Sequence, residues 1–220
     1  MTSNFLQVVG RSRVYPLTDR NISGISHAEQ VSRLSALGVS VIQLREKSLS
    51  SRDFYAETES AISTARNLGI KLIVNDRIDI ALALKADGVH LGQDDLDPEV
   101  ARRLMGPEAI IGISTHTLEQ AQVASQMPVN YIAIGPVFPT LSKESPNAIV
   151  GLDGIRAVRN AIGKIPLVAI GGITLLSRRE VLNAGADCVS IISDLWESPG
   201  HVRKTSPDHS IPGPTNLTEQ

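Results

Sequence analysis

Eight short apolar runs alternate with helical patterns along residues 14–193. Each run is dominated by Val, Ile, Leu and Ala, and continuous apolar runs of this kind are typical of strands buried on both faces. Strands that alternate with helices predict βαβ units and a parallel sheet. The predicted strands are Val14–Thr18, Val39–Arg45, Lys71–Asn75, Gly88–Leu91, Ala109–Ser114, Tyr131–Gly135, Pro166–Gly172 and Asp187–Ser193.

The strand count favours one architecture over its main alternative. Eight strands within about 180 residues fit a compact (β/α)8 TIM barrel, an α/β fold. The alternative is an open doubly wound sheet, which usually has fewer strands. Helix boundaries support the alternation: we expect Ser26, Ser51 and Asp97 as N-caps, with Gly69 ending the helix that follows Ser51.

The two ends of the chain depart from this alternation. A closing helix is due after Ser193, but residues 199–220 contain four prolines and cannot present an apolar stripe. We therefore expect a barrel domain over residues 1–198 whose final helix is missing or degenerate, and an extended or disordered tail over 199–220. An apolar strip would then lie open between the first and seventh helices, covered either by a homo-oligomer contact or by Phe5–Val9.

Composition and charge exclude several classes of protein. Lys and Arg number 21 against 23 Asp and Glu, and with a net charge of −2 the chain has no surplus of positive charge to neutralise a nucleic-acid backbone. The single cysteine, Cys188, rules out an intrachain disulfide and favours a reducing compartment. No run approaches the roughly 20 apolar residues of a membrane span, and no signal sequence is visible. These features predict a soluble, cytoplasmic protein without a membrane partner.

Polar residues gather where the predicted strands end, which is where TIM barrels carry their active sites. Arg and Lys bind phosphate, two carboxylates suit a Mg²⁺-bound diphosphate, and glycine-rich ends of the seventh and eighth strands often bind a phosphate. The pattern therefore suggests a metal diphosphate near strands two to four and a second phosphate near strands seven and eight. The residues concerned are Gln43, Arg45, Lys47, Asn75, Asp76, His90, Gln93, Asp94, Asp95, Ser114, Thr115, His116, Thr140, Ser142, Lys143, Gly171, Gly172, Ile192 and Ser193.

Each of these residues also has an ordinary structural explanation. Aspartates often cap turns, paired glycines allow tight packing, and histidines inside a barrel can simply be hydrogen-bonded. All of these structural explanations would have to be true at once at six strand ends of one rim. Because that coincidence is improbable, the gathering of polar residues there favours a functional site.

Several segments resemble the thiamine-phosphate synthase (thiamine-phosphate pyrophosphorylase) family. The combination of QLREK, ND and GVHLGQ-x-D is specific, whereas GGI alone would be weak. The resemblance implies a (β/α)8 barrel and a transferase that couples 4-amino-2-methyl-5-hydroxymethylpyrimidine diphosphate to 4-methyl-5-(2-hydroxyethyl)thiazole phosphate, giving thiamine phosphate and diphosphate. The matching segments are VYPLTD (14–19), VIQLREK (41–47), LIVNDRIDIALALKADGVHLGQDDL (72–96), IIGISTH (110–116), YIAIGPVFPTLSK (131–143), VAIGGI (168–173) and GADCVSIIS (185–193).

The resemblance also assigns roles to the residues that match the family motifs. Arg45, Lys47, Lys143 and Ser114 are implied as catalytic, and Asp76 and Asp95 as ligands of Mg²⁺. The implied pyrimidine-diphosphate site comprises Gln43, Arg45, Lys47, Asn75, His90, Ser114 and Lys143. The implied thiazole-phosphate site comprises Thr140, Ser142, Gly172, Ile192 and Ser193.

Three positions depart from the family pattern, and two other functions stay open. Ser142 stands where the family usually has Thr, Pro16 interrupts the first strand, and Asp194 replaces a small residue before the tail. The first alternative function is thiazole tautomerase, a related barrel that uses a histidine at the position of His116. The second is a non-catalytic barrel that binds a phosphorylated ligand.

Overall fold

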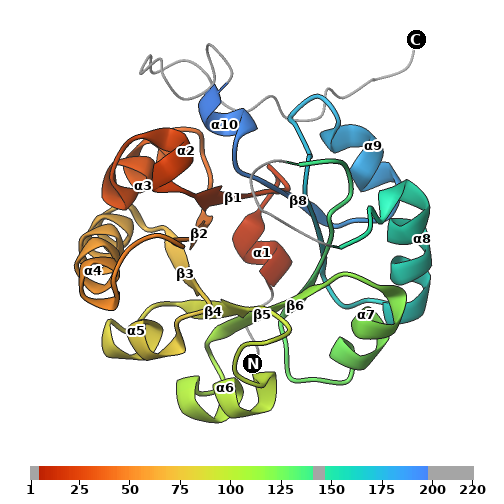
Figure 1. Ribbon diagram of the computed structural model, residues 1–220, viewed down its shortest axis with the longest axis horizontal. Helices are drawn as coiled ribbons and strands as arrows, with labels where there is room; N and C mark the ends of the chain where they lie inside the picture. Colours follow the sequence, from red (N-terminus) through yellow and green to blue (C-terminus); the bar gives the residue numbers. More distant parts are fainter. Residues whose placement is uncertain (1–4, 141–146, 198–220) are drawn as a thin grey trace.

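The computed structural model describes residues 5–140 and 147–197 and shows a closed parallel barrel of eight strands in sequence order. Figure 1 looks along the barrel, with the helices arranged around the strands. The strands are β1 (Val14–Thr18), β2 (Val41–Leu44), β3 (Lys71–Asn75), β4 (Gly88–Leu91), β5 (Ile110–Thr115), β6 (Tyr131–Ile134), β7 (Leu167–Ile170) and β8 (Cys188–Ile191). The barrel prediction is confirmed, and the open sheet is excluded because β1 pairs with β8.

The helices α2 to α9 lie between successive strands and cover the outside of the barrel, whereas α1 precedes β1 and α10 follows β8. Their bounds are α1 (Phe5–Val9), α2 (Arg20–Ser23), α3 (His27–Ser35), α4 (Ser51–Leu68), α5 (Ile78–Ala83), α6 (Pro98–Met105), α7 (Leu118–Ala124), α8 (Gly151–Ile162), α9 (Arg178–Asn183) and α10 (Asp194–Glu197). No helix of the described part of the chain is long and apolar enough to cross a bilayer.

Side-chain caps set the helix boundaries, with one correction to the sequence prediction. Ser26 and Asp97 cap α3 and α6 as expected, and Gly69 ends α4 in a left-handed conformation. The N-cap of α4 is Ser50, because its hydroxyl accepts a hydrogen bond from the N–H of Asp53, and Ser51 is the first helical residue. Adjacent serines carry the same capping signal, so the sequence pattern did not separate them.

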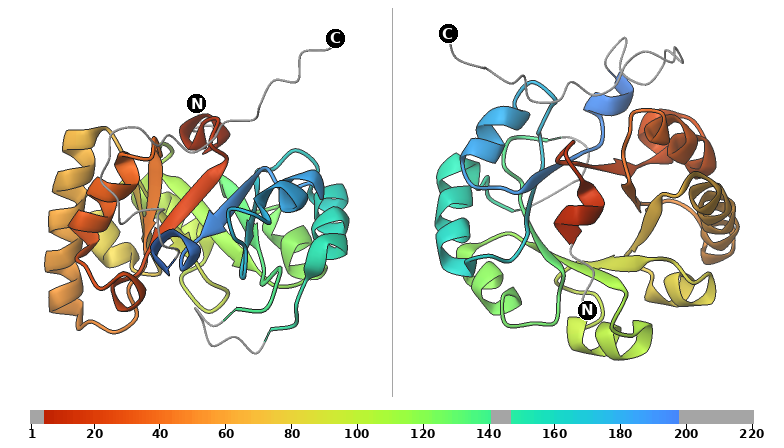
Figure 2. Two further views of the ribbon diagram at one scale, coloured as in Figure 1. Left: turned by 90° about the horizontal axis from the view of Figure 1, so that it is seen from above. Right: turned by 180° about the vertical axis from the view of Figure 1, so that it is seen from behind.

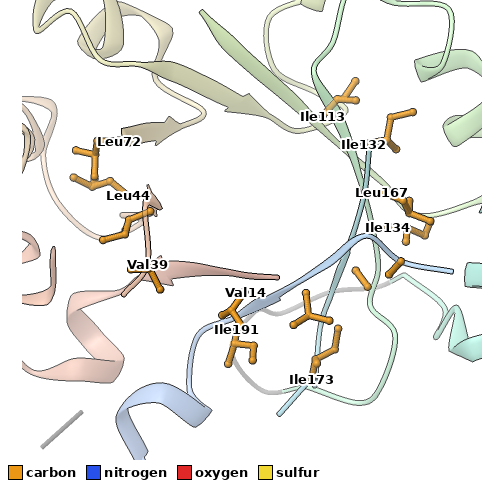
Figure 3. Close-up of a cluster of buried hydrophobic side chains, with 14 of the residues drawn as sticks. Val14, Val39, Leu44, Leu72, Ile113, Ile132, Ile134, Leu167, Ile173 and Ile191 are labelled. Atoms are coloured by element: carbon orange, nitrogen blue, oxygen red, sulfur yellow. The ribbon is translucent and has the colours of Figure 1, made fainter. Parts of the chain in front are cut away.

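The strands bury both faces, and the two faces contribute to different cores. Outward-facing side chains pack against the helices, as the cluster in Figure 3 illustrates with Val14, Leu44 and Leu72. Inward-facing side chains fill the barrel interior, and this second cluster comprises Phe5, Val9, Tyr15, Val41, Ile73, Ile110, Tyr131, Ala133, Val168 and Cys188. Cys188 is fully buried, as expected of a core residue.

The helix α1 closes the end of the barrel where the strands begin, as the side view of Figure 2 shows. Phe5 is 1% exposed and stacks on Tyr131, with ring centroids 4.1 Å apart. The expectation that Phe5–Val9 covers the outer seam is therefore wrong. Gly112 leaves room beside the Tyr131 ring, since a Cβ there would lie 2.0 Å from that ring, and Phe5 fills the remaining interior space.

The closing seam is covered in part by α10, a helix of four residues. Leu195 and Trp196 are buried in the outer core, and α10 contacts α2 beside β1. A missing or degenerate final helix was expected, and within the described residues α10 has a single turn that ends at Glu197, where the described part of the chain stops. Pro16 does not prevent closure, because it lies in register with Ile191 within the β1–β8 pair. The predicted tail over 199–220 lies outside the described residues.

Candidate active site

The predicted site residues of β2 lie along the inner face of one strand and continue past its end. Gln43 is buried inside the barrel, where its Nε2 donates to the Tyr15 hydroxyl at 3.2 Å. The Arg45 guanidinium pairs with the Asp19 carboxylate, and both side chains are largely buried at 12% and 10% exposure. Lys47 is half-exposed beyond the strand. From the interior to the rim of the barrel, the structure thus places first the Gln43 amide, then the Arg45 guanidinium and then the Lys47 ammonium, with increasing exposure.

Lys47 meets the two carboxylates predicted to bind a metal. Its Nζ contacts Oδ2 of Asp76, the residue that follows β3. Asp95, in the loop after β4, lies beside Asp76, and its Oδ2 accepts a hydrogen bond from the N–H of Gly92 at 2.6 Å. Burial raises the pKa of the Asp95 carboxyl, and the adjacent Asp76 charge raises this pKa further. A cation between the two carboxylates would relieve that repulsion.

The donor set of this pair suits a hard divalent cation that keeps open positions. Within residues 5–140 and 147–197, no three His, Cys, Asp or Glu side chains form a complete metal cage. Mg²⁺ does not need one, because it is commonly held by one or two carboxylates together with water and substrate phosphate oxygens. Asp76 and Asp95 therefore fit a Mg²⁺ ion that arrives with a diphosphate.

Residues of β3, β4 and β5 line the neighbouring wall. Asn75 is in register with His90, and both are mostly buried. The Nε2 of His90 lies 2.8 Å from the Ser114 hydroxyl, and the Gln93 amide donates to the Ser114 carbonyl at 2.6 Å. The structure thus brings into contact His90 and Ser114, which the family resemblance had assigned to one subsite.

Two other polar residues near the end of β5 have partners that limit their roles. The Thr115 hydroxyl donates to the Ala133 carbonyl at 2.8 Å and is buried, so it serves the β5–β6 contact. The His116 ring holds the Gly135 carbonyl through Nδ1 at 2.6 Å. His116 is therefore fixed against the start of the β6–α8 loop.

The predicted phosphate end of the site lies at β7 and β8. Gly172 is exposed and has a φ of 65°, and a Cβ there would lie 2.4 Å from the carbonyl oxygen of Pro139. Glycine is therefore required for the β7 end to approach the loop that leads to Thr140. Ile192 and Ser193 are partly exposed after β8, where the N–H of Leu175 donates to Asp194 at 2.9 Å and joins the two loops. Ser142 and Lys143 lie outside the described residues.

Several residues that organise this rim were not predicted from the sequence. Asp19 follows β1 directly, so the rule of polar strand ends applied to β1 would have found it. Glu46 and His27 form a second support: His27 Nε2 lies 3.3 Å from Glu46 Oε2, and the other Glu46 oxygen accepts the N–H groups of Lys47 and Ser48, each at 2.8 Å. These contacts fix the turn that carries Lys47.

Ionisation keeps this second support in one charge state. Burial lowers the pKa of His27, and the nearby Glu46 and Glu57 carboxylates, which raise this pKa, offset the effect of burial only in part. Burial alone would raise the pKa of Glu46, but hydrogen bonds from Ser48, His27 and Lys47 outweigh it and lower that pKa. A neutral His27 therefore supports a carboxylate at Glu46 near neutral pH.

Comparison with known proteins identifies relatives of the whole barrel. A thiamine-phosphate synthase of Koribacter versatilis is 44% identical over 194 residues, covering 85% of this chain and 90% of that protein. A thiamine-phosphate synthase of Syntrophomonas wolfei is 44% identical over 195 residues, covering 87% and 93%. The solved structure of a thiamine phosphate pyrophosphorylase from Pyrococcus furiosus superposes with a TM-score of 0.77 at 36% identity, covering 88% and 92%.

The family comparison spans the same region as the barrel. The sequence model described as thiamine monophosphate synthase matches residues 14–195, from the first residue of β1 into α10. This match includes every strand and every predicted site residue. The chain therefore belongs to the thiamine monophosphate synthase family.

Proposed function

We propose that this chain is a thiamine-phosphate synthase that joins 4-amino-2-methyl-5-hydroxymethylpyrimidine diphosphate to 4-methyl-5-(2-hydroxyethyl)thiazole phosphate and releases diphosphate. The observation that carries the proposal is the convergence of Arg45, Lys47, Asp76 and Asp95 at one rim of the barrel. Two cations beside two adjacent carboxylates suit a metal-bound diphosphate better than any other common ligand. The similarity to named synthases over most of the chain supports the same assignment.

The leaving diphosphate is the group on which negative charge grows during this reaction. Arg45 and Lys47 bind it, and they stabilise the transition state more than the ground state because the charge of the leaving group increases. The Asp19 carboxylate holds the Arg45 guanidinium in place before substrate arrives. Asn75 and the sequence-predicted Lys143 complete the set of diphosphate contacts in this proposal.

Asp76 and Asp95 hold Mg²⁺ in this proposal. When bound, the ion neutralises charge on the departing diphosphate. With Asp76 engaged by the ion, the Lys47 ammonium that now pairs with it would be available to a phosphate oxygen. The chain itself needs no strong base or nucleophile, because departure of diphosphate leaves a pyrimidine-methyl cation that the thiazole nitrogen attacks directly.

The remaining residues position the two rings. Gln43, His90 and Ser114 orient the pyrimidine at the interior end of the site. Thr140, Ser142, Gly172, Ile192 and Ser193 receive the thiazole phosphate, with backbone N–H groups at the ends of β7 and β8 as donors. Holding both substrates in reacting geometry supplies much of the rate enhancement.

A coupled assay tests the proposal against its alternatives. The purified protein is incubated with both substrates and Mg²⁺, and thiamine phosphate and diphosphate are measured; equal amounts of the two products are expected. A thiazole tautomerase would alter a thiazole phosphate without releasing diphosphate, and a non-catalytic barrel would bind a substrate without forming product. Either of those results would overturn the proposal.

A further inference from the structure

A continuous chain of hydrogen bonds crosses the barrel interior from β2 to β5. Gln43 Nε2 lies 3.2 Å from Tyr15 Oη, and Tyr15 Oη lies 3.0 Å from Tyr131 Oη. Tyr131 Oη lies 2.9 Å from His90 Nδ1, and His90 Nε2 lies 2.8 Å from Ser114 Oγ. The two ends, Gln43 and Ser114, are the residues proposed to contact the pyrimidine, whereas the two tyrosines lie between them and below the site.

The chemistry of the groups gives this chain a direction. The Gln43 amide nitrogen can only donate, so the Tyr15 oxygen accepts that hydrogen bond, and the Tyr15 hydroxyl donates in turn to the Tyr131 oxygen. The Tyr131 hydroxyl then donates to His90 Nδ1. His90 is left with its proton on Nε2, which donates to the Ser114 oxygen. The Ser114 hydroxyl proton is thereby left available to a group other than His90.

Packing prevents the two phenol rings from leaving this arrangement. The Tyr131 ring is stacked between Phe5 and His90, with centroids 4.1 Å and 5.5 Å away. Tyr15 packs edge-on against Tyr131 at 5.6 Å, and both tyrosines are at most 1% exposed. Burial also raises the pKa of both phenols above the usual range, so both remain donors.

The direction of the chain also decides what the Gln43 amide offers to a ligand. Its Nε2 donates to Tyr15, the amide also interacts with the Tyr131 hydroxyl, and among the described residues its Oε1 accepts no hydrogen bond. The site therefore presents one fixed acceptor, Gln43 Oε1, and one fixed donor, the Ser114 hydroxyl.

We propose that Tyr15 and Tyr131 are positioning residues that fix the hydrogen-bond polarity of the pyrimidine site and so select an aminopyrimidine over an oxopyrimidine. An amino group donates to Gln43 Oε1, and an unprotonated ring nitrogen accepts from Ser114. An oxopyrimidine reverses both groups, because its carbonyl accepts and its ring N–H donates, and leaves buried polar atoms unpaired. This inference rests on the proposed function, because it assigns the pyrimidine to Gln43 and Ser114.

Kinetic discrimination in two variants tests the proposal. Tyr131→Phe and Tyr15→Phe each remove one hydroxyl, with its two hydrogen bonds, and keep the aromatic packing, and Tyr55→Phe, on the exposed face of α4, is the matched control. The measured quantity is kcat/KM for the aminopyrimidine diphosphate divided by that for its oxo analogue. Both interior variants are expected to lower this ratio by about tenfold, the equivalent of roughly one buried hydrogen bond, without changing the KM for the thiazole phosphate. An unchanged ratio in correctly folded interior variants would overturn the proposal.

The tautomer of His90 is a second readout that does not depend on catalysis. Nitrogen-15 NMR of the substrate-free protein at pH 7.5, with His90→Asn used to assign the signal, should find a neutral ring protonated on Nε2. In Tyr131→Phe the Nδ1 signal should change because it loses its donor, while Tyr55→Phe should leave it unchanged. A His90 ring protonated on Nδ1 in the unmodified protein contradicts the direction of the chain. A failed synthase assay with the expected tautomer would refute the proposed function and retain the hydrogen-bond chain.

Discussion

The Lys47 ammonium is paired with the Asp76 carboxylate across the neighbouring ends of β2 and β3. The pair joins a cation proposed to bind diphosphate to a carboxylate proposed to bind a metal. Both groups therefore have a partner before any ligand arrives, and in the proposed function both would exchange it for a metal diphosphate. Because Lys47 is 49% exposed, the pair contributes little to folding, and its importance lies in the site.

Lys47→Ala should separate function from stability. We expect kcat/KM for the pyrimidine diphosphate to fall at least about tenfold, since the ammonium stabilises the leaving group, and the melting temperature to change little. Lys71→Ala is a matched control, because Lys71 forms a similarly exposed pair with Asp87 at the opposite end of the barrel. A large loss of stability in Lys47→Ala alone would show that the pair is structural.

The two carboxylates should be required for Mg²⁺-dependent turnover. Asp76→Asn and Asp95→Asn should each lower kcat about 100-fold if each ligand supplies a few kcal/mol of transition-state stabilisation. Asp94→Asn, a neighbouring exposed residue, should retain activity. Chelation of Mg²⁺ should abolish turnover in the unmodified protein. Near-normal turnover in both carboxylate variants would disprove the metal assignment.

Asp19→Asn should weaken substrate binding by freeing Arg45. In the present structure one Asp19 oxygen accepts the N–H groups of Asn21 and Ile22, and the amide oxygen of the variant can do the same and cap α2. The amide nitrogen that replaces the other oxygen cannot pair with the Arg45 guanidinium. We expect the KM for the pyrimidine diphosphate to rise about tenfold, by loss of one charge-assisted contact. Asp19→Ala should in addition lower stability by about 1 kcal/mol through loss of the cap. Equal stability of the two variants would contradict the capping role.

Phe5→Ala should destabilise the barrel strongly. Phe5 fills the interior between Tyr15 and Tyr131, and truncating a buried phenylalanine costs about 3–5 kcal/mol. Gln7→Ala, an exposed position of the same helix, should have almost no effect on denaturant unfolding. Similar midpoints for the two variants would mean that α1 does not close the barrel.

Stability should fall on acidification through His27. Because burial lowers its native pKa below 6.5, the unfolded state binds a proton more readily than the folded state. The stabilisation is complete above pH 6.5 and is lost as pH falls from 6.5 toward the lower native value. Its surroundings include Glu46, Glu57 and Arg20. Melting curves of His27→Gln should have a shallower pH dependence in this range, and an unchanged slope would refute the assignment.

Local patterns in the sequence were sufficient for the architecture and for the end of the barrel at which the predicted site residues gather. The apolar runs predicted β1, β3 and β4 with their observed bounds, because continuous burial of both faces leaves the same mark wherever a strand lies in a barrel. Strand alternation predicted Gln43 and Arg45 on one face; Gln43 is buried inside the barrel, whereas Arg45 follows the last residue of β2 and pairs with Asp19. Asp76 and Asp95 were predicted to meet because parallel strands end at the same rim.

The partners of these residues depended on contacts that no local pattern records. Tyr15 and Tyr131 are 116 positions apart, and their hydroxyls meet only because barrel closure places both in the interior. The position of Phe5 likewise depended on the space left beside Gly112, and not on the apolar character of α1 alone.

The sequence by itself thus determined the order of the elements, the rim that carries the chemistry and the residue types on it, because periodicity and strand ends are local properties. Only the tertiary structure decided that Phe5 fills the interior, that Asp19 holds Arg45, and that a series of hydrogen bonds joins Gln43 to Ser114. The physical reason is that these contacts depend on strand register and on the volume left after all eight strands close, which every part of the barrel sets together.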